Sequence, residues 1–501
     1  MSSCPSDAEF AELKRCFADR TWRLNNLYWI TDKRSNRVKF KLNTAQAKLV
    51  KDMHNRNVTL KCRQKGITTF WCIFALDAAL FNSNFSAGII AHNLDDAKEI
   101  FRTKVKFPYD NLPESIRKAR PASQEQAGML VFDNNSKISV STSFRSGTLN
   151  LLHVSELGKI AAKYPDRARE IKSGALEAVP MDGIASYEST AEGACGYFYD
   201  VCKEAQDHAA SGNKLTPLDF KFHFFPWWID DEYEMDPEGV VITAELEKYF
   251  TEIEANTGAS LSPRKRAWYA VKSKNLGDDM LREYPSTPEE AFRASVQGAY
   301  YSAQFSRVRA EKRIVNIPIE DGIPVNTAWD LGMDDYTAIV FYQNVGREIR
   351  FIDYYENNGE GLSHYKRVLE ERGYLYGNHY FPHDIKVREL SGDGKSRKES
   401  LEAMGIRVTI APNLAVSDGI EASRKLLSMC WFDEKRCATL VSRLESYRKS
   451  WNDKLGVFME QPVHDEASHT ADAFRYAAIT HEFDTPHGYL PPGQKHKSRV
   501  L

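Results

Sequence analysis

Three acidic motifs in the last third of the chain constrain its fold more than any other feature. They read TAWDLGMDDYTAIVFY from residue 327, HYFPHDI from residue 379 and HDEASHTADAFRYAA from residue 464. Asp330 follows an apolar run that predicts a strand, and the glycine and acids after it predict a turn. Asp384 ends a shorter strand-like run, and Asp472 lies in alanine-rich sequence that favours a helix. We therefore expect the acids at the ends of two strands and on a closing helix.

This placement of acids is typical of an RNase H-like nuclease. Two divalent ions about 4 Å apart can hold the attacking and leaving oxygens of a phosphodiester. Mg²⁺ and Mn²⁺ prefer hard oxygen ligands, which carboxylates supply. We predict that Asp330, Asp384 and Asp472 are catalytic and bind two Mg²⁺ or Mn²⁺ ions, although three surface aspartates would give the same pattern. His464 and His469 are further candidate ligands, or polar neighbours of the carboxylates.

A candidate nucleotide site lies in the first half of the chain. Residues 57–62 predict a buried strand, RQKGITT follows at 63–69, and residues 70–80 predict an apolar helix. A strand, a tight glycine turn, a hydroxyl pair and a helix can form a phosphate cradle. In such a cradle the backbone N–H groups and the helix N-terminus face the anion, and a threonine hydroxyl reaches Mg²⁺.

The loop departs from the usual pattern G-x-x-x-x-G-K-[ST]. Gly66 and Thr68 are in place, but Ile67 stands where the lysine is expected, and the first glycine is missing. Arg63 or Lys65 could supply the missing charge from the other side of the loop. An ordinary basic turn between a strand and a helix would look the same.

A second strand end strengthens the nucleotide hypothesis. Residues 149–156 form a mostly apolar run that ends in Ser155 and Glu156. The usual ending is Asp-Glu, in which the aspartate orients Mg²⁺ through water and the glutamate activates the attacking water. Ser155 can do the first task weakly, and Glu156 can do the second unchanged. Another apolar run, at 183–188, leads into small hydroxyl residues that suit a γ-phosphate sensor.

Taken together, the motifs resemble the large terminase subunit of tailed bacteriophages and prophages. The resemblance runs from about Tyr28 to Tyr476. It is carried by FKLNTAQAKLV, CRQKGITT, RSGTLNLLHVSELGKI, ESTAEG, REYPSTPEEAF and the three acidic motifs in order. Members of that family package viral DNA into a preformed capsid. Their ATPase domain drives translocation, and their C-terminal nuclease cuts the concatemer.

The resemblance implies roles for individual residues. Gln46 would read the adenine, Glu156 would activate water, and Arg145 would be an arginine finger acting on a neighbouring subunit. The resemblance also implies a set of nucleotide-binding residues: Arg63, Gln64, Lys65, Gly66, Ile67, Thr68, Thr69, Ser155, Ser189 and Thr190. Of these, Thr68 would also bind Mg²⁺. The three acids of the last third match the nuclease metal ligands.

The expected fold class is α/β. It comprises an N-terminal P-loop ATPase with a parallel sheet of the RecA/ASCE type, a lid or linker subdomain, and a C-terminal RNase H-like nuclease domain. The predicted boundaries are 1–210 for the ATPase core with its lead-in, 211–315 for the lid or linker, 316–485 for the nuclease and 486–501 for a flexible basic tail.

Composition excludes several classes of protein. Among 501 residues, 42% are hydrophobic and 27% are charged, as in a soluble globular protein. No apolar run approaches membrane-spanning length, the N-terminus is unlike a secretory signal, and eight cysteines without a C-x-x-C pair predict reduced thiols. A net charge of −2 argues for local contacts with DNA, for which the basic stretch 386–398 beside the second acid is the best candidate.

The predicted function is ATP-driven translocation of double-stranded DNA into a procapsid, combined with Mg²⁺- or Mn²⁺-dependent endonuclease cutting. The motor would use ATP with Mg²⁺. Expected partners are double-stranded DNA, a portal protein and a small terminase subunit, without a membrane. The chain would be a monomer in solution and a homo-oligomeric ring on the portal, in the host cytoplasm and not in the mature virion. The alternatives are a helicase-nuclease of repair or restriction, and an inactive prophage remnant that only binds DNA or portal.

Overall fold

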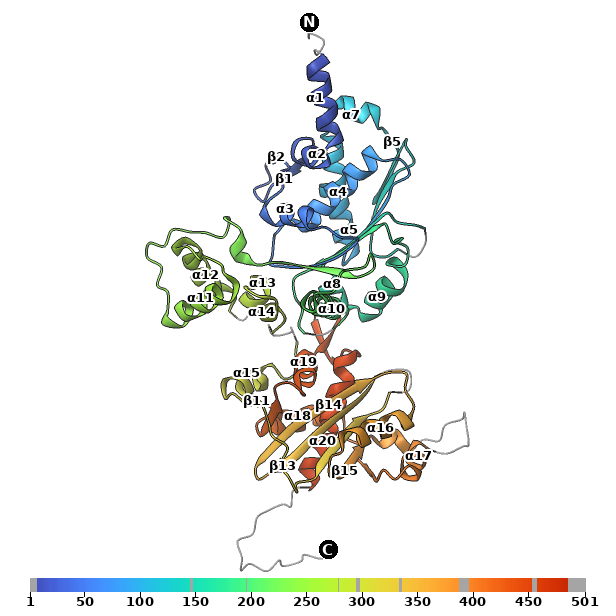
Figure 1. The fold of residues 1–501 in the computed structure, drawn as a ribbon, viewed down its shortest axis with the longest axis vertical. Coiled ribbons are helices and arrows are strands. Elements are labelled where there is room, and N and C mark those ends of the chain that lie inside the picture. The colour runs from blue at the N-terminus through green and yellow to red at the C-terminus, as the bar shows by residue number, and fades with distance from the viewer. Residues whose placement is uncertain are drawn as a thin grey trace, which may run out of the picture. The chain divides into compact units, whose positions relative to one another are not determined.

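The computed structural model divides the chain into two compact units, residues 1–295 and 296–501 (Figure 1). The residues that it describes are 7–144, 147–194, 196–277, 279–293, 298–332, 336–386, 396–452 and 457–484. Arg145, most of the basic stretch 386–398 and the tail from residue 486 lie outside them.

An eight-stranded sheet forms the centre of the first unit. Across the sheet, the strands are β10 (Phe220–Phe225), β3 (Arg56–Lys61), β9 (Ile184–Ser189), β8 (Leu151–Ser155), β4 (Ser86–Ile90), β7 (Lys137–Ser141), β6 (Met129–Phe132) and β5 (Ala122–Gln126). The strands from β10 to β7 are parallel, and β6 and β5 extend that edge antiparallel. Parallel strands place their carboxyl ends at one edge, which is where the candidate nucleotide motifs lie.

Helices cover this sheet and precede it. The hairpin β1 (Trp29–Thr31) and β2 (Arg37–Lys39) and the following helices belong to the first half of the unit: α1 (Asp7–Ala18), α2 (Arg20–Asn26), α3 (Thr44–Lys51), α4 (Ile67–Phe81), α5 (Leu94–Ile100), the π-helical turn η1 (Phe101–Lys106), α6 (Phe107–Asp110) and α7 (Glu114–Ala119). The later ones are α8 (Leu157–Lys163), α9 (Pro165–Glu170), the π-helical turn η2 (Ile171–Ala175) and α10 (Tyr197–Ser211).

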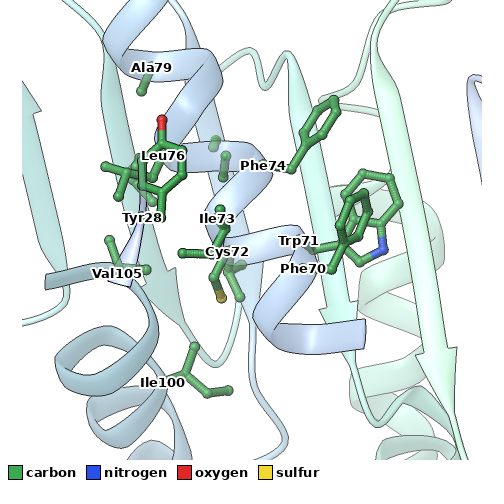
Figure 2. Close-up of a cluster of buried hydrophobic side chains, with 14 of the residues drawn as sticks. Tyr28, Phe70, Trp71, Cys72, Ile73, Phe74, Leu76, Ala79, Ile100 and Val105 are labelled. Carbon is green, nitrogen blue, oxygen red and sulfur yellow. The ribbon is translucent and has the colours of Figure 1, made fainter. Parts of the chain in front are cut away.

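Helix α4 follows the candidate phosphate loop and is apolar on every face. Figure 2 shows Phe70, Trp71 and Phe74 on one side of it and Tyr28 and Val105 on the other, all of them in one core cluster. A helix with apolar residues all round is stable only where it is covered on all sides. The core therefore fixes this helix, and with it the loop at its N-terminus.

The predicted boundary at residue 210 falls in the last turn of α10, and the strand that follows belongs to the same sheet. β10 pairs in parallel with β3, so residues 220–225 complete the ATPase-like sheet. Beyond it lie the 3₁₀ turn η3 (Trp227–Ile229), α11 (Ala244–Thr257), α12 (Pro263–Leu276), α13 (Asp279–Glu283) and α14 (Pro288–Arg293). η3, α11, α12 and α13 share an aromatic core that also includes Cys62 of the loop, whereas Ala291 and Phe292 of α14 belong to a core of the sheet. The proposed division of the chain into four parts stays a prediction.

The second unit has a mixed seven-stranded sheet. Its strands, across the sheet, are β11 (Ile314–Val315), β17 (Cys430–Asp433), β14 (Glu348–Asn357), β13 (Thr337–Val345), β12 (Val325–Asp330), β15 (Tyr376–Phe381) and β16 (Val408–Ile410). β13 is antiparallel to both of its neighbours, and β12 is parallel to β15. Alternate residues of β13 enter two different cores, with Val340 in one and Ile339 in the other, so both faces of the sheet are covered.

The other elements of this unit are α15 (Ser302–Ala310), α16 (Leu362–Arg372), the 3₁₀ turn η4 (His383–Lys386), α17 (Arg397–Ala403), α18 (Val416–Leu426), α19 (Ala438–Ser446), the hairpin β18 (Lys449–Asn452) and β19 (Val457–Pro462), and α20 (Glu466–Asp484). Helix α20 packs on β12 and β13. The α/β fold class expected from the sequence is confirmed. In the described part of the chain, no helix is both long and apolar enough to cross a membrane.

Candidate nucleotide and metal sites

The loop between β3 and α4 has the backbone of an anion cradle. Gln64 and Gly66 both adopt left-handed conformations, with φ of 59° and 68°. Gly66 is the N-cap of α4, and among the described residues no side chain caps that end of the helix. The first N–H groups of α4 are therefore free to face an anion. The side chain of Ile67 is buried in the core, so its backbone alone is available to a ligand.

Gln46 braces this loop from α3. Its Nε2 donates to the carbonyl oxygen of Gly66 at 2.9 Å, and its Oε1 accepts from the backbone of Asn43. A Cβ on Gly66 would lie 2.8 Å from that Nε2, so the close approach requires glycine. Gln46 was expected to read an adenine, whereas here its amide is bonded to backbone groups at both ends.

Arg63 and Lys65 both pair with acids from the segment after β10. Arg63 forms an ion pair with Glu283, and its backbone N–H also donates to the Glu283 carbonyl oxygen. Lys65 is buried and forms an ion pair with Asp230. These two residues were the sequence candidates for the missing phosphate-binding charge, and both are engaged away from the end of α4.

A lysine that the sequence analysis missed points into the site. Lys61, the last residue of β3, has its Nζ 3.0 Å from Oε1 of Glu156 and 3.2 Å from Oε2 of Glu188. Burial by itself lowers the pKa of Lys61, but the two carboxylates raise it above its ordinary value. Lys61 could have been noticed because it ends a strand in which every residue is buried. A buried lysine needs a functional or electrostatic reason.

Glu156 sits at the tip of β8 in a left-handed conformation with φ of 58°. That conformation is costly for a residue other than glycine and is characteristic of functional positions. Burial would raise the pKa of Glu156, but the ion pairs with Lys61 and with Lys159, each at 3.0 Å, hold that pKa at about 2. In this state the carboxylate is ionised and locked between two ammonium groups.

Three side chains are hydrogen-bonded to one another beside the first turn of α4: Thr68 of that helix, Ser155 of β8 and Glu188 of β9. The Thr68 hydroxyl donates to Oε1 of Glu188 and lies 3.2 Å from the Ser155 hydroxyl. Ser155 donates to the same oxygen at 3.0 Å. Glu188 was quoted in a motif but not singled out as a site residue.

Ser189 and Thr190, two of the nucleotide-binding residues that the resemblance implies, lie directly beyond Glu188 and are buried. A Cβ on Gly158 of α8 would come within 2.7 Å of the Ser189 hydroxyl oxygen. The start of α8 and the end of β9 are therefore packed too closely to move independently. Thr69 occupies the third position of α4, where it is partly exposed.

The residues at this edge of the sheet fit a nucleotide with a divalent cation. They supply an uncapped helix N-terminus, a buried ammonium group, a threonine hydroxyl and two carboxylates. The hydroxyl of Ser189 is buried without a hydrogen bond to any described residue, and Oε2 of Glu188 pairs with Lys61 at 3.2 Å. Polar atoms buried without partners are costly, and a bound ligand or its water would satisfy them.

A second cluster of titratable groups lies in the other unit, where β12 ends against α20. Nδ1 of His469 lies 3.0 Å from Oδ2 of Asp330, within hydrogen-bonding distance. Asp472 pairs with Arg475 at 3.2 Å. Burial raises the pKa of Asp472 to about 6. The nearby Asp330 carboxylate also raises this pKa, whereas Arg475, His469 and His464 lower it. The rings of His464 and His469 are 5.0 Å apart.

Asp384 lies at the same sheet edge but is exposed. It belongs to η4, shortly after β15, and β15 runs parallel to β12. Within the described ranges, no three His, Cys, Asp or Glu side chains are grouped closely enough to hold a metal. Asp330, Asp472 and the two histidines are thus neighbours, but they are not arranged as a metal site. The role of Asp384 as a third ligand stays a prediction.

Comparison with known proteins gives structural neighbours but no sequence match. No protein-family model matches the chain, and no curated protein does. The large terminase of bacteriophage HK97 matches with a TM-score of 0.40 at 12% identity, over 93% of this chain and 98% of that chain. The large terminase ATPase domain of Thermus phage P74-26 matches 49% of this chain and 94% of its own, with a TM-score of 0.35 and 17% identity.

The nuclease of the large terminase from thermophilic phage G20c, solved with bound cobalt, covers 36% of this chain and 96% of its own, with a TM-score of 0.27 and 17% identity. The structural neighbours are phage large terminases. The resemblance expected from the motifs is thus found among solved structures. At this level of similarity to large terminases, the roles of individual residues depend on the geometry of the two sites.

Proposed function

We propose that the chain is the ATPase and nuclease subunit of a viral DNA-packaging motor. The observation that carries the proposal is the convergence of three parallel strand ends on the N-terminus of α4. Lys61 comes from β3, Glu156 from β8 and Glu188 from β9, around Thr68. Positive charge, hydroxyl and carboxylates at the carboxyl ends of parallel strands are what phosphoryl transfer requires.

In the motor, the chain positions and polarises the reactants. The N–H groups at the start of α4 and the Lys61 ammonium group bind the phosphates, and Thr68 contributes a hydroxyl to the Mg²⁺ site. When bound, ATP supplies the bond to be cleaved, and Mg²⁺ neutralises its β and γ oxygens. Glu156 orients and activates the attacking water as general base. Arg145, which lies outside the described residues, would act on a neighbouring subunit.

The ion pair between Lys61 and Glu156 suggests how hydrolysis is coupled to binding. A carboxylate whose pKa is about 2 is a poor general base, because a base is most effective when its pKa is near the operating pH. An anion in the loop attracts Lys61 and so weakens its pairing with Glu156. Glu156 then becomes more basic only when the loop is filled.

In the nuclease, Asp330 and Asp472 would bind the divalent ions, with Asp384 completing the set. Their proximity is supported by the raised pKa of Asp472, to which Asp330 contributes after burial. His469 holds the Asp330 carboxylate at 3.0 Å and so fixes its orientation. Cleavage of the DNA backbone by this chemistry reads phosphate rather than base edges.

The finer assignments follow from this activity. The substrate of both sites would be double-stranded DNA, and the partners a portal protein and a small terminase subunit. A monomer in solution would form a ring on the portal, in the host cytoplasm, and leave before the virion matures. The motor would use ATP with Mg²⁺, and the nuclease two Mg²⁺ or Mn²⁺ ions.

Glu156→Gln tests the motor. The variant should lose ATP hydrolysis by about a hundredfold or more, because removal of a general base costs about 10² to 10⁴. It should still bind ATP, since Glu156 acts on water. Hydrolysis is followed by phosphate release with DNA and portal present, and binding by a fluorescent ATP analogue. Glu204→Gln, an exposed acid on α10, is the matched control and should behave as wild type. Normal turnover by Glu156→Gln would exclude Glu156 from the mechanism.

Asp330→Asn and Asp472→Asn test the nuclease. Each should abolish cleavage of plasmid DNA in Mg²⁺ or Mn²⁺ and leave ATP hydrolysis near wild type, since the acids belong to the second unit. Ca²⁺ should not support cleavage, because it binds oxygen ligands in looser geometry. Asp384→Asn shows whether the exposed acid takes part. Asp418→Asn on α18 is the matched control. Full cleavage by Asp472→Asn would refute the site.

A further inference from the structure

The motor site lacks an acid at the position where such sites usually have one. Ser155 ends β8 at the place of the aspartate that holds Mg²⁺ in P-loop enzymes. A serine hydroxyl is neutral, so it cannot replace the charge of that carboxylate. The structure nevertheless places a carboxylate beside the loop threonine, and it comes from the neighbouring strand.

Glu188 is the register partner of Ser155 across the parallel pair of β8 and β9. Its Oε1 accepts hydrogen bonds from the hydroxyls of both Thr68 and Ser155. The two hydroxyls are themselves 3.2 Å apart. The acid of this site is therefore on β9, the strand next to β8, and it still contacts the hydroxyl of Thr68.

The side chain of Glu188 is surrounded by other buried groups of the motor site. Its side chain is fully buried, and Oε2 lies 3.2 Å from the Lys61 ammonium group. His153, also fully buried, is 3.7 Å from Oε1, and burial lowers the pKa of that histidine to about 4, so it is neutral at pH 7. Oε2 accepts no well-oriented hydrogen bond from any described residue. Oε1 thus binds the two hydroxyls, and Oε2 pairs with the ammonium group of Lys61.

We infer that Glu188 supplies the carboxylate of the motor's Mg²⁺ site, in place of the acid that is absent at Ser155. This inference rests on the proposed ATPase function. The hydrogen bond that Glu188 accepts from Thr68 would leave the lone pairs of that hydroxyl for the cation, and the Glu188 carboxylate would add negative charge beside it. Glu188 is a positioning residue, and it supplies the negative charge that a hard divalent cation requires.

A purely structural role as counter-ion of Lys61 is the competing explanation. The two roles differ in what happens when the acid is moved. A counter-ion stabilises the fold and lowers phosphate affinity whether or not Mg²⁺ is present. A metal-site acid affects nucleotide binding only when Mg²⁺ is present, and it can be replaced by an acid on the other strand that contacts Thr68.

The experiment measures binding of a fluorescent ATP analogue to the full chain, in Mg²⁺ and in EDTA. Variants are Glu188→Gln, Ser155→Asp and the exchange double variant Ser155→Asp/Glu188→Gln. Glu188→Gln should lose roughly 10- to 100-fold in affinity in Mg²⁺ and change little in EDTA, as for other residues that orient metal ligands. The exchange variant should recover most of the loss. Mn²⁺ electron paramagnetic resonance with ATP gives a second readout, in which Glu188→Gln should bind less Mn²⁺ and the exchange variant should restore it.

The possible failures are distinguishable. If the wild type binds ATP no better in Mg²⁺ than in EDTA, the proposed ATPase site is wrong, and this inference falls with it. If the wild type depends on Mg²⁺ and Glu188→Gln depends on it equally, only the inference about Glu188 is overturned. If Glu188→Gln does not fold, as judged by circular dichroism, the exchange variant is measured alone. Wild-type Mg²⁺ dependence then supports the inference, and its loss refutes it.

Discussion

In the motor site, the Lys61 ammonium group is paired with both Glu156 and Glu188. Arg63 and Lys65 were the sequence candidates for the phosphate-binding charge, but they are paired with Glu283 and Asp230. Lys61 instead faces Glu156 and lies at the end of the strand that leads into the loop. A ligand anion therefore competes for Lys61 with groups that belong to the same site, whereas Arg63 and Lys65 would have to leave acids of another segment.

Lys61→Met should weaken ATP binding by roughly ten- to a hundredfold, the equivalent of one charged hydrogen bond. Arg63→Ala should weaken it less, because that side chain is half exposed and already paired. Affinity is measured with a fluorescent ATP analogue after circular dichroism has shown that each variant folds. Lys61→Arg, which keeps the charge, is the control and should retain part of the affinity. A larger loss from Arg63→Ala would move the role to Arg63.

At the scale of the element, the loop before α4 depends on one glycine. Gly66 and Gly212 have nearly the same left-handed backbone, with φ of 68° and 70°. An added Cβ at Gly66 meets Nε2 of Gln46 at 2.8 Å, whereas at Gly212, the C-cap of α10, it meets nothing within 4 Å. The two positions therefore separate backbone strain from steric displacement.

Gly66→Ala and Gly212→Ala should each destabilise the fold by about 1 kcal/mol through backbone strain. Gly66→Ala should lose about another 1 kcal/mol, because it displaces the Gln46 amide from its hydrogen bond to the loop. It should also weaken ATP binding, and Gly212→Ala should not. Thermal unfolding and nucleotide titration measure both effects. Equal behaviour of the two variants would mean that the Gln46 brace contributes nothing.

The strands and helices of the site were predictable from local sequence, but the contacts between its side chains were not. The apolar run before Ser155, the strand before Cys62 and the helix after Gly66 all follow from short-range patterns. The meeting of Glu188 with Thr68 depends on which strands are neighbours, since β9 lies between β3 and β8. Strand order in a parallel sheet is set by long crossovers, and no local pattern encodes it.

The second unit shows the same division between local pattern and tertiary contact. Asp330 lies at a strand end and Asp472 on a helix, as their local sequences predicted. Asp384 follows its strand by several residues in a 3₁₀ turn, and its side chain is exposed. His469 reaches Asp330 because α20 packs on β12. The sequence leaves this histidine open between ligand and polar neighbour, and in the structure its Nδ1 lies 3.0 Å from Oδ2 of Asp330.

At the scale of the whole molecule, each unit has hydrophobic cores of its own and its own buried histidines. The first unit is built on three core clusters and the second on two. Burial lowers the pKa of His153 and His223 in the first unit, and of His379 in the second, to about 4. A group that must stay neutral when folded makes stability depend on pH, so both units should lose stability in mild acid.

His223 offers the clearest test of this pH dependence. It lies in β10, with Nε2 3.0 Å from Oδ1 of Asn57, and its pKa of about 4 when folded returns to about 6.5 when the chain unfolds. The folded pKa is the lower one, so the unfolded chain binds more protons between pH 6.5 and 4, and stability falls as the pH falls through that window. From pH 6.5 to 5.0 the loss from this one group is about 1.6 kcal/mol.

His223→Gln removes that proton-binding site and should flatten the pH dependence of the first unit by about 2 kcal/mol between pH 7 and 5. Burial raises the pKa of Glu192, which acts in the opposite direction, but Glu192 is present in both proteins and cancels in the comparison. Hydrogen exchange of peptides from β3 and β10, corrected for intrinsic rates, measures the opening free energy of this unit directly. His208→Gln on α10 controls for the loss of one imidazole. The same pH slope in wild type and His223→Gln would show that His223 is not held neutral by the fold, since only a group whose pKa changes on folding contributes to that slope.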